Sequence, residues 1–288
     1  MAEIPFTKMQ GIGNDFVVID GHNRSQDWSA LAIRLCDRHK GVGADGLLIV
    51  EASERADLRM RMFNPDGTED VCGNGMRCVV RYAWEQRLVT AEQWQLETGS
   101  GIRSVVISKG TEGALEAVSV DMGEPLFSPD QIPALLPNPY DYPLLLSNGD
   151  CLVLTALSTG STHAVTFVES LPDDATFLRI SPLVEEHPFF PERTSLMWCR
   201  VDGQNRLSIR IWERGLGETW GCGTGACATA IVALLHGYAN PDLPVHVASK
   251  GGTLEILWRQ GDSILMRGPA ETLFHGLVEF VEDDSSAK

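Results

Sequence analysis

The sequence lacks the features that are typical of membrane proteins, secreted proteins and nucleotide-binding proteins. Its 288 residues contain no apolar run long enough to cross a bilayer. The segment Met1–Pro5 has no basic region leading into an apolar one, as a secretory signal would. Gly41-Val42-Gly43 is not followed by a third glycine, and no Gly-Lys-Ser/Thr ending occurs. We therefore expect no nucleotide and no other cofactor.

Basic residues are also scarce. The chain has 23 Lys and Arg against 39 Asp and Glu, which gives a formal net charge of −16. This charge disfavours nucleic acids and anionic membrane surfaces as partners, so local donors must hold any anionic substrate. The cysteine count of seven is odd, and a chain of this length can build two domains with cores that need no disulfides. We expect reduced thiols and a cytoplasmic location.

The most informative feature that is present is a cysteine–glycine turn that occurs twice. It reads CGNGMRC over Cys72–Cys78 and CGTGAC over Cys222–Cys227, and each copy runs into apolar residues at helical spacing. Glycines allow a tight turn that leaves the first helix N–H groups free to bind an anion, and the positive helix end favours a thiolate. Two such thiols beside a carboxylate pocket predict a two-base proton shuttle, with Cys72 and Cys222 as its catalytic residues.

The other five cysteines are predicted to be structural. Cys78 and Cys227 lie inside the predicted helices, while Cys36, Cys151 and Cys199 are expected to be small apolar fillers. The cysteine spacing is wider than that of a zinc knuckle, and no His lies at a matching distance, so we expect no metal site. The absence of Cys-x-x-Cys disfavours a thiol redox or ligand-binding protein without epimerase activity, which stays an alternative.

Short strand patterns separated by polar or glycine-rich turns fill most of the chain. The predicted strands are Phe6–Gln10, Asp15–Asp20, Gly46–Glu51, Leu58–Asn64, Trp94–Leu96, Ser104–Ser108, Leu115–Asp121, Leu152–Ala156, Ala164–Val168, Leu196–Val201, Leu207–Trp212, Val245–Ala248, Leu254–Trp258, Ile264–Met266 and Leu277–Val281. Helices are predicted at Trp28–Arg38 and after each cysteine turn. Gly237 and Pro241 are expected to stop the last helix.

The two cysteine turns lie about half a chain apart, which predicts an α+β protein of two related, mostly β domains. The first domain is expected at 1–124, with the C-terminal strand able to return to it, and the second at 145–282. Residues 125–144 are rich in proline and are predicted to be a linker, and 283–288 a tail. The site is expected in the cleft between the domains.

Three longer motifs resemble those of diaminopimelate epimerases. They are MQGIGNDF at Met9–Phe16, FNPDG at Phe63–Gly67 before the first cysteine turn, and WERGLGET at Trp212–Thr219 before the second. The resemblance covers nearly the whole chain. It implies a pyridoxal-independent isomerase that interconverts LL- and meso-diaminopimelate in lysine and peptidoglycan biosynthesis and that forms a homodimer. It also implies two pseudo-symmetric domains, each wrapped round a central helix.

The resemblance also implies the roles of individual residues. Cys72 and Cys222 match the two catalytic cysteines, and His163 and Glu213 match residues that tune their pKa values. The main-chain N–H groups that follow the cysteines would bind the reacting carboxylate, and Arg214 could bind the distal one. The residues that match substrate contacts are Asn14, Asn64, Gly73, Asn74, Ser161, Ser195, Glu213, Arg214, Gly223 and Thr224.

Three positions depart from the family pattern. Ser161 and Ser195 stand where asparagines are usual, and Gly46 stands where a glutamine is common. These smaller side chains reach less far toward the distal end of a substrate, although a serine still donates one hydrogen bond and water can fill a gap. An epimerase or racemase of another amino acid with the same two thiols is therefore the alternative function.

Overall fold

The computed structural model describes residues 2–70, 72–111 and 113–280, so Val281 and the predicted tail 283–288 lie outside the described residues. The chain divides into two units. Unit 1 comprises the described residues of Met1–Gly11, Asp15–Val118 and Ala270–Lys288, and unit 2 comprises Ile12–Asn14 and Ser119–Pro269.

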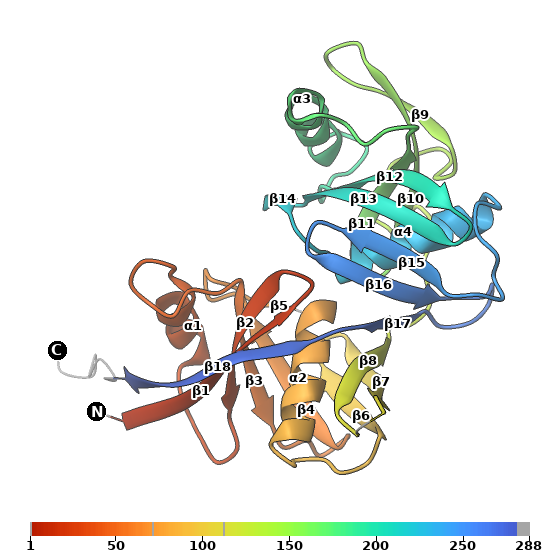
Figure 1. The fold of residues 1–288 in the computed structure, drawn as a ribbon. Coiled ribbons are helices and arrows are strands. Elements are labelled where there is room, and N and C mark those ends of the chain that lie inside the picture. The colour runs from red at the N-terminus through yellow and green to blue at the C-terminus, as the bar shows by residue number, and fades with distance from the viewer. Residues whose placement is uncertain (1, 71, 112, 281–288) are drawn as a thin grey trace. The chain divides into compact units, whose positions relative to one another are not determined.

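Unit 1 contains two helices and one connected set of strands (Figure 1). Its elements are β1 (Ala2–Gly11), β2 (Asn14–Asp20), α1 (Trp28–Cys36), β3 (Gly46–Glu51), β4 (Leu58–Phe63), β5 (Glu69–Asp70), α2 (Gly73–Glu85), β6 (Gln93–Thr98), β7 (Gly101–Lys109), β8 (Leu115–Asp121), which continues into unit 2, and β18 (Glu271–Phe280). The pairing runs β18–β1–β2–β3–β4–β6–β7, and the short β5 pairs with β4. The C-terminal strand β18 therefore belongs to unit 1, where it pairs antiparallel with β1.

Unit 2 also contains two helices. Its elements are β9 (Tyr142–Leu145), β10 (Cys151–Ser158), β11 (Thr162–Phe167), α3 (Asp174–Glu185), β12 (Ser195–Gly203), β13 (Arg206–Glu213), β14 (Gly217–Thr219), α4 (Gly223–Leu235), β15 (Val245–Ser249), β16 (Gly252–Leu257) and β17 (Leu265–Gly268). The pairing runs β9–β10–β11–β12–β13–β15–β16–β17, and the short β14 pairs with β13.

The two units repeat one topology. In each, two strands joined by a crossover helix lie parallel, as β2 and β3 do around α1 and as β11 and β12 do around α3. A short strand then leads into the cysteine helix, α2 or α4. The α+β fold predicted from the sequence is confirmed, and the repeat explains why the cysteine turn occurs twice.

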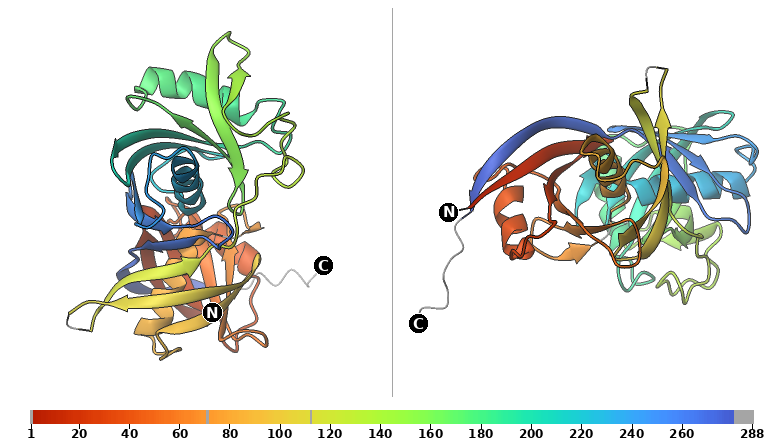
Figure 2. Two further views of the ribbon diagram at one scale, coloured as in Figure 1. Left: turned by 90° about the vertical axis from the view of Figure 1, so that its right-hand side faces the viewer. Right: turned by 90° about the horizontal axis from the view of Figure 1, so that it is seen from below.

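The crossover helices and the cysteine helices pack on strands that are buried on both sides. Leu47 and Ile49 of β3 belong to the core around α1, whereas Leu48 of the same strand lies against α2. Strand residues alternate between the two faces of a sheet, so a strand buried on both faces reads as an unbroken apolar run. In the left view of Figure 2, α4 is seen with the strands of unit 2 around it, and it packs against strands that include β11, β15 and β16.

Several elements differ from the sequence predictions. Helix α3 was not predicted, because Pro182 lies inside its last turns and a proline precedes its start. The helix is capped by Asp173, whose side chain accepts a 2.8 Å hydrogen bond from the Thr176 N–H. The proline-rich segment 125–144 does not stand apart as a linker, because Ile132 and Leu136 are buried in the core of unit 2. Strands β5, β9 and β14 were also missed.

The structural cysteines follow the prediction with one exception. Cys36, Cys78, Cys199 and Cys227 are buried, but Cys151 is exposed at the start of β10, so its interpretation as an apolar filler is wrong. The predicted helix stop is confirmed: α4 ends at Leu235, and Gly237 has φ +72°. No helix within residues 2–70, 72–111 and 113–280 is both long and apolar enough to span a membrane.

Candidate active site

Cys72 occupies the N-cap position of α2. Its backbone is extended, with φ −134° and ψ 120°, and its side chain is half-buried. The helix approaches β3 so closely that a Cβ on Gly75 would lie 2.9 Å from Leu48 Cδ2. The second glycine of the motif therefore lies at a close helix contact and not in a turn as predicted, and the helix itself begins at Gly73, directly after the cysteine.

Cys222 occupies the same position at the start of α4. Its φ of −127° and ψ of 113° nearly repeat those of Cys72, but its side chain is buried, with 5% of the residue exposed. The sulfur accepts a hydrogen bond from the Gly225 N–H at 3.4 Å and lies 3.4 Å from Thr224 Oγ1. A Cβ on Gly225 would lie 2.6 Å from Met197 Sδ, which is the counterpart of the contact between Gly75 and β3.

The thiol of Cys222 is strongly biased toward its protonated form. Burial raises the pKa of Cys222 well above its ordinary value, and the Glu213 carboxylate raises it further through its charge and a hydrogen bond. Hydrogen bonds from Thr224 and from the Gly225 N–H act in the opposite direction and do not offset burial. The direction of this shift is opposite to the one expected from the helix start, because burial disfavours the charged thiolate.

His163 lies on β11, beside the helix that carries Cys222. It is fully buried, and burial followed by the positive charge of Arg214 lowers the pKa of His163 to about 3. Its Nε2 lies 3.1 Å from Ser161 Oγ, while Nδ1 has no hydrogen-bond partner among the residues that the structure describes. The imidazole is thus neutral at pH 7.

Glu213 and Arg214 lie at the end of β13, where the chain turns into β14. The Thr219 hydroxyl donates a 2.8 Å hydrogen bond to Glu213 Oε2, which holds this carboxylate near Cys222. The Arg214 N–H donates to Ser195 Oγ at 3.1 Å, and Ser195 pairs with His163 across the parallel strands. Unit 2 therefore brings Glu213, Arg214, Ser195, His163 and Cys222 together.

The remaining predicted residues fall into both units. Asn64 of unit 1 follows β4, donating from its N–H to Thr68 O at 2.8 Å and from Nδ2 to Thr68 Oγ1 at 3.0 Å. Asn14 groups with unit 2, whereas the next residue, Asp15, binds Lys8 in unit 1. A Cβ on Gly46 would lie 2.8 Å from Met62 Cε and 3.1 Å from Phe63 O, so a larger residue there requires the end of the Met62 side chain to move.

Sequence reasoning missed two buried charged residues next to the predicted site. Arg77 of α2 is fully buried and donates from Nη2 to Asn74 Oδ1 at 2.8 Å. Glu185 at the end of α3 is 6% exposed and accepts a hydrogen bond from the Gly215 N–H. Arg77 could have been noticed as a charged residue on an apolar helix face, but no pattern in the sequence links Glu185 to the turn at Arg214.

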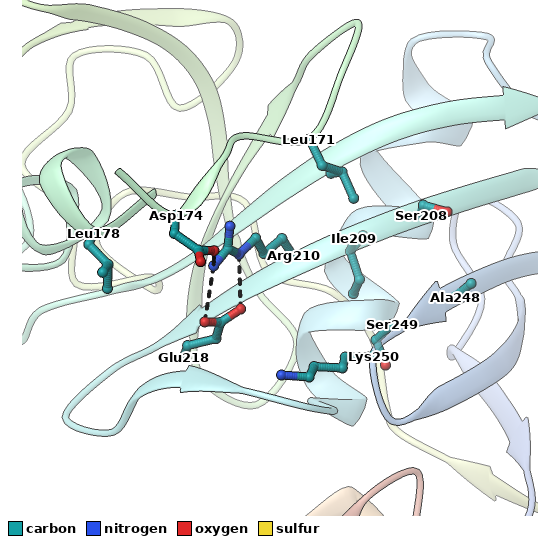
Figure 3. Close-up of a pocket in the computed structure, with 10 residues that line it drawn as sticks. All are labelled: Leu171, Asp174, Leu178, Ser208, Ile209, Arg210, Glu218, Ala248, Ser249 and Lys250. Atoms are coloured by element: carbon teal, nitrogen blue, oxygen red, sulfur yellow. Dashed lines mark hydrogen bonds and ion pairs between the residues drawn. The ribbon is translucent and has the colours of Figure 1, made fainter. Parts of the chain in front are cut away.

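A separate groove of unit 2 is lined by none of the predicted site residues. It has a volume of about 550 Å³ and is lined by Arg210 together with Asp174, Glu218 and Lys250 (Figure 3). Within the described part of the chain, no three His, Cys, Asp or Glu side chains gather where they could bind a metal ion.

Comparison with known proteins decides the family. The model of the family described as diaminopimelate epimerase matches residues 6–128 and 155–273. The chain belongs to the diaminopimelate epimerase family. The diaminopimelate epimerase of Heliobacterium modesticaldum is 41% identical over 278 residues, covering 94% of this chain and 98% of its own. That of Moorella thermoacetica is 44% identical over 278 residues, with the same coverage.

Solved structures of distant proteins share the diaminopimelate epimerase fold of this chain. A probable proline racemase from Agrobacterium radiobacter K84 has a TM-score of 0.73 at 16% identity, covering 98% of this chain and 94% of that one. A phenazine biosynthesis protein of the PhzF family from Bacillus anthracis has a TM-score of 0.68 at 18% identity, covering 97% and 100%. At these identities the likeness shows the fold alone.

Proposed function

We propose that this chain is a cofactor-independent epimerase that interconverts LL- and meso-diaminopimelate, with Cys72 and Cys222 as its two catalytic residues. One observation carries the proposal: both cysteines occupy the N-cap of the equivalent helix in a repeated fold, in a chain of the diaminopimelate epimerase family. Such an enzyme would serve lysine and peptidoglycan biosynthesis.

The proposed reaction moves one proton off the α-carbon and another onto its opposite face. A thiolate takes the α-proton and becomes a thiol, the electron pair stays on the substrate as a carbanion, and the second thiol gives its proton to that carbanion and becomes a thiolate. The configuration inverts, and the protonation states of the two cysteines are exchanged. Solvent protons then restore the starting state.

Cys222 is the proton donor in the resting state of this scheme. Its buried sulfur and the neighbouring Glu213 raise the pKa of Cys222, so the thiol keeps its proton at pH 7. Cys72 then serves as the base in that direction, and in the reverse direction the roles change. Glu213, through its contact with Cys222, and His163, through its neutral imidazole, are proposed to tune the two sulfurs.

The substrate carboxylates would be held by main-chain and side-chain donors. The N–H groups of Gly73, Asn74, Gly223 and Thr224 lie at the positive ends of α2 and α4, where they can stabilise the charge that develops at the reacting carboxylate. Arg214 is proposed to bind the distal carboxylate with two parallel hydrogen bonds. The proposed contacts to the rest of the substrate are Asn14, Asn64, Ser161 and Ser195.

Incubation with LL-diaminopimelate in deuterated water tests the function directly. We expect deuterium at the α-carbon together with conversion to the meso form, because the incoming proton originates from solvent. Mass spectrometry and chiral chromatography measure the two changes. Absence of both from the purified, folded protein would refute the proposal.

A second candidate keeps the chemistry and changes the substrate. Gly46, Ser161 and Ser195 favour it, since each is smaller than the residue usual in the family resemblance. A panel of single amino acids in the same exchange assay separates the two candidates. Deuterium incorporation into one of these amino acids, without incorporation into diaminopimelate, would establish the second candidate.

We further propose a homodimer in the cytoplasm, as the family resemblance implies. The edge strand β18 supports the dimer, because Leu273, Phe274 and Leu277 are each about half exposed or more on it, at 50%, 48% and 64%. Analytical ultracentrifugation of the purified protein measures the association, and a monomer at micromolar concentration would contradict it.

A further inference from the structure

We infer that Glu185, outside the sequence motifs of the site, is a positioning residue that holds the turn carrying Arg214 and thereby controls binding of the distal end of the substrate. The inference rests on the proposed function for its kinetic consequence. The underlying observation is the contact between a buried carboxylate and the main chain of that turn.

The carboxylate of Glu185 accepts hydrogen bonds from three donors. The Gly215 N–H donates to Oε1 at 2.8 Å, the Trp212 indole N–H donates to Oε2 at 2.6 Å, and Arg193 Nη1 donates to Oε1 at 3.2 Å. The main chain of Glu185 takes part as well, since its carbonyl accepts a 3.2 Å hydrogen bond from the Thr194 N–H. One residue thus holds both sides of Arg214 and the residue before Ser195.

Three donors around one group require a carboxylate. A carboxylate presents only acceptor atoms, whereas a glutamine amide presents one oxygen and an NH₂ group that would face a donor. Glu185 is only 6% exposed, and burying a carboxylate costs free energy unless its oxygens accept hydrogen bonds. The three donors, among them the charged Arg193, offset that cost.

The helix that presents Glu185 is anchored at its other end too. Arg210 of β13 donates to Asp174 at the start of α3 at 2.8 Å and to Glu218 of β14 at 2.9 Å, as the dashed contacts in Figure 3 show. The Arg210 guanidinium also lies 3.9 Å from the ring centre of Phe177. A side chain on a helix fixed at both ends holds its partner with little freedom.

The hydrogen bonds that the Glu185 carboxylate accepts form a clamp on the turn after β13. This clamp acts on Arg214 more than on Glu213. Glu213 is the last residue of β13, where it pairs with Gly217, and the Thr219 hydroxyl holds its carboxylate. Arg214 is the first residue beyond the strand, and its side chain is exposed, with Nη1 donating to Glu192 O at 3.2 Å. Loss of Glu185 would therefore loosen substrate binding and leave the Cys222 and Glu213 pair in place.

The test compares Glu185→Gln with Glu186→Gln, which removes the same charge from the next, exposed residue. For Glu185→Gln we expect the KM for diaminopimelate to rise about tenfold or more, as for the loss of a charged hydrogen bond. We expect kcat to stay within about threefold, because the proton-transfer groups keep their places. Glu186→Gln should match the wild type in both constants.

Amide hydrogen exchange of the turn gives a readout that does not need activity. In Glu185→Gln the Gly215 amide should exchange faster, while the exchange rates of the amides in β12 and β13 should stay the same. If Glu185→Gln does not fold, Trp212→Phe removes one donor while keeping the carboxylate, and a smaller KM increase supports the clamp.

An unchanged KM and an unchanged Gly215 amide in the folded variant would overturn the inference, as would an equal fall of kcat in both glutamine variants. A wild-type protein without epimerase activity would instead refute the proposed function, and the exchange of Gly215 would still decide whether the clamp exists.

Discussion

The two units build the same backbone around the same cysteine and then surround the two sulfurs differently. Cys72 is half-buried at the start of α2, with the fully buried Arg77 in the following turn. Cys222 is buried at the start of α4, where Cys227 stands at the position equivalent to Arg77 and Glu213 lies beside the sulfur. The helix after one cysteine thus carries a buried cation, whereas a carboxylate lies beside the sulfur of the other, so a repeated fold surrounds its two cysteine turns with different charges.

The turns before the two cysteines are also held in different ways. In unit 1, Asn64 and Thr68 bond to each other, and Ser29 of α1 donates to Gly67 O at 2.8 Å. In unit 2, the turn after β13 depends on the distant carboxylate of Glu185 on α3. In both units the crossover helix reaches this turn, but only in unit 2 does it supply a charged group among the contacts described above. Both units thus keep a contact between the crossover helix and this turn, but a serine hydroxyl makes it in unit 1 and a carboxylate in unit 2.

The largest effect is expected from removal of either thiol. Cys72→Ala and Cys222→Ala should each lower kcat/KM about a thousandfold, or about 4 kcal/mol of transition-state stabilisation, because each variant lacks one of the two proton carriers. Steady-state assays of epimerisation measure this. Cys151→Ala, which changes an exposed cysteine, serves as the control and should retain full activity. A fully active variant at position 72 or 222 would contradict the two-base scheme.

A smaller effect, on stability, is expected from the residues five positions after each cysteine. Arg77→Ala should lower the free energy of unfolding by about 3 kcal/mol, since it leaves a cavity and removes the donor to Asn74 Oδ1. Cys227→Ala removes only a small buried thiol and should cost about 1 kcal/mol. Urea denaturation measures both. Equal losses would show that the buried charge of Arg77 has no special part in unit 1.

An effect that is absent near pH 7 and grows only in acid is expected from the strand residues Phe16 and His163, which occupy equivalent places beside Gly46 and Ser195. The pKa of His163 is lowered by burial to about 3, so below about pH 6.5 the unfolded chain binds a proton that the folded chain does not. Stability is then lost as the pH falls from about 6.5 toward 3, by up to about 1.4 kcal/mol per pH unit.

His163→Phe copies the residue of unit 1 and should flatten this acid dependence. Thermal unfolding midpoints of variant and wild type between pH 7 and pH 4 provide the measurement. An acid dependence as steep in the variant as in the wild type would mean that His163 is not the group that titrates.

Much of the fold could be predicted because the relevant signals are local. The residues Gly46–Glu51 predict a strand, and the structure confirms those bounds and shows Gly46 to Val50 buried, as in a strand covered on both faces. The spacing after Cys222 predicts a helix that ends before Gly237. Helix α3 was missed because Pro182 interrupts its pattern, and packing of Phe177 and Val184 in the core stabilises it despite the proline.

The sequence by itself determined most of the strand and helix pattern, the repeat of the cysteine turn and the family, because each depends on residue type and spacing along the chain. Only the tertiary structure decided that Cys222 keeps its proton, since burial and the approach of Glu213 arise when distant segments pack together. The same holds for Glu185, whose three donors converge on it only in the folded unit.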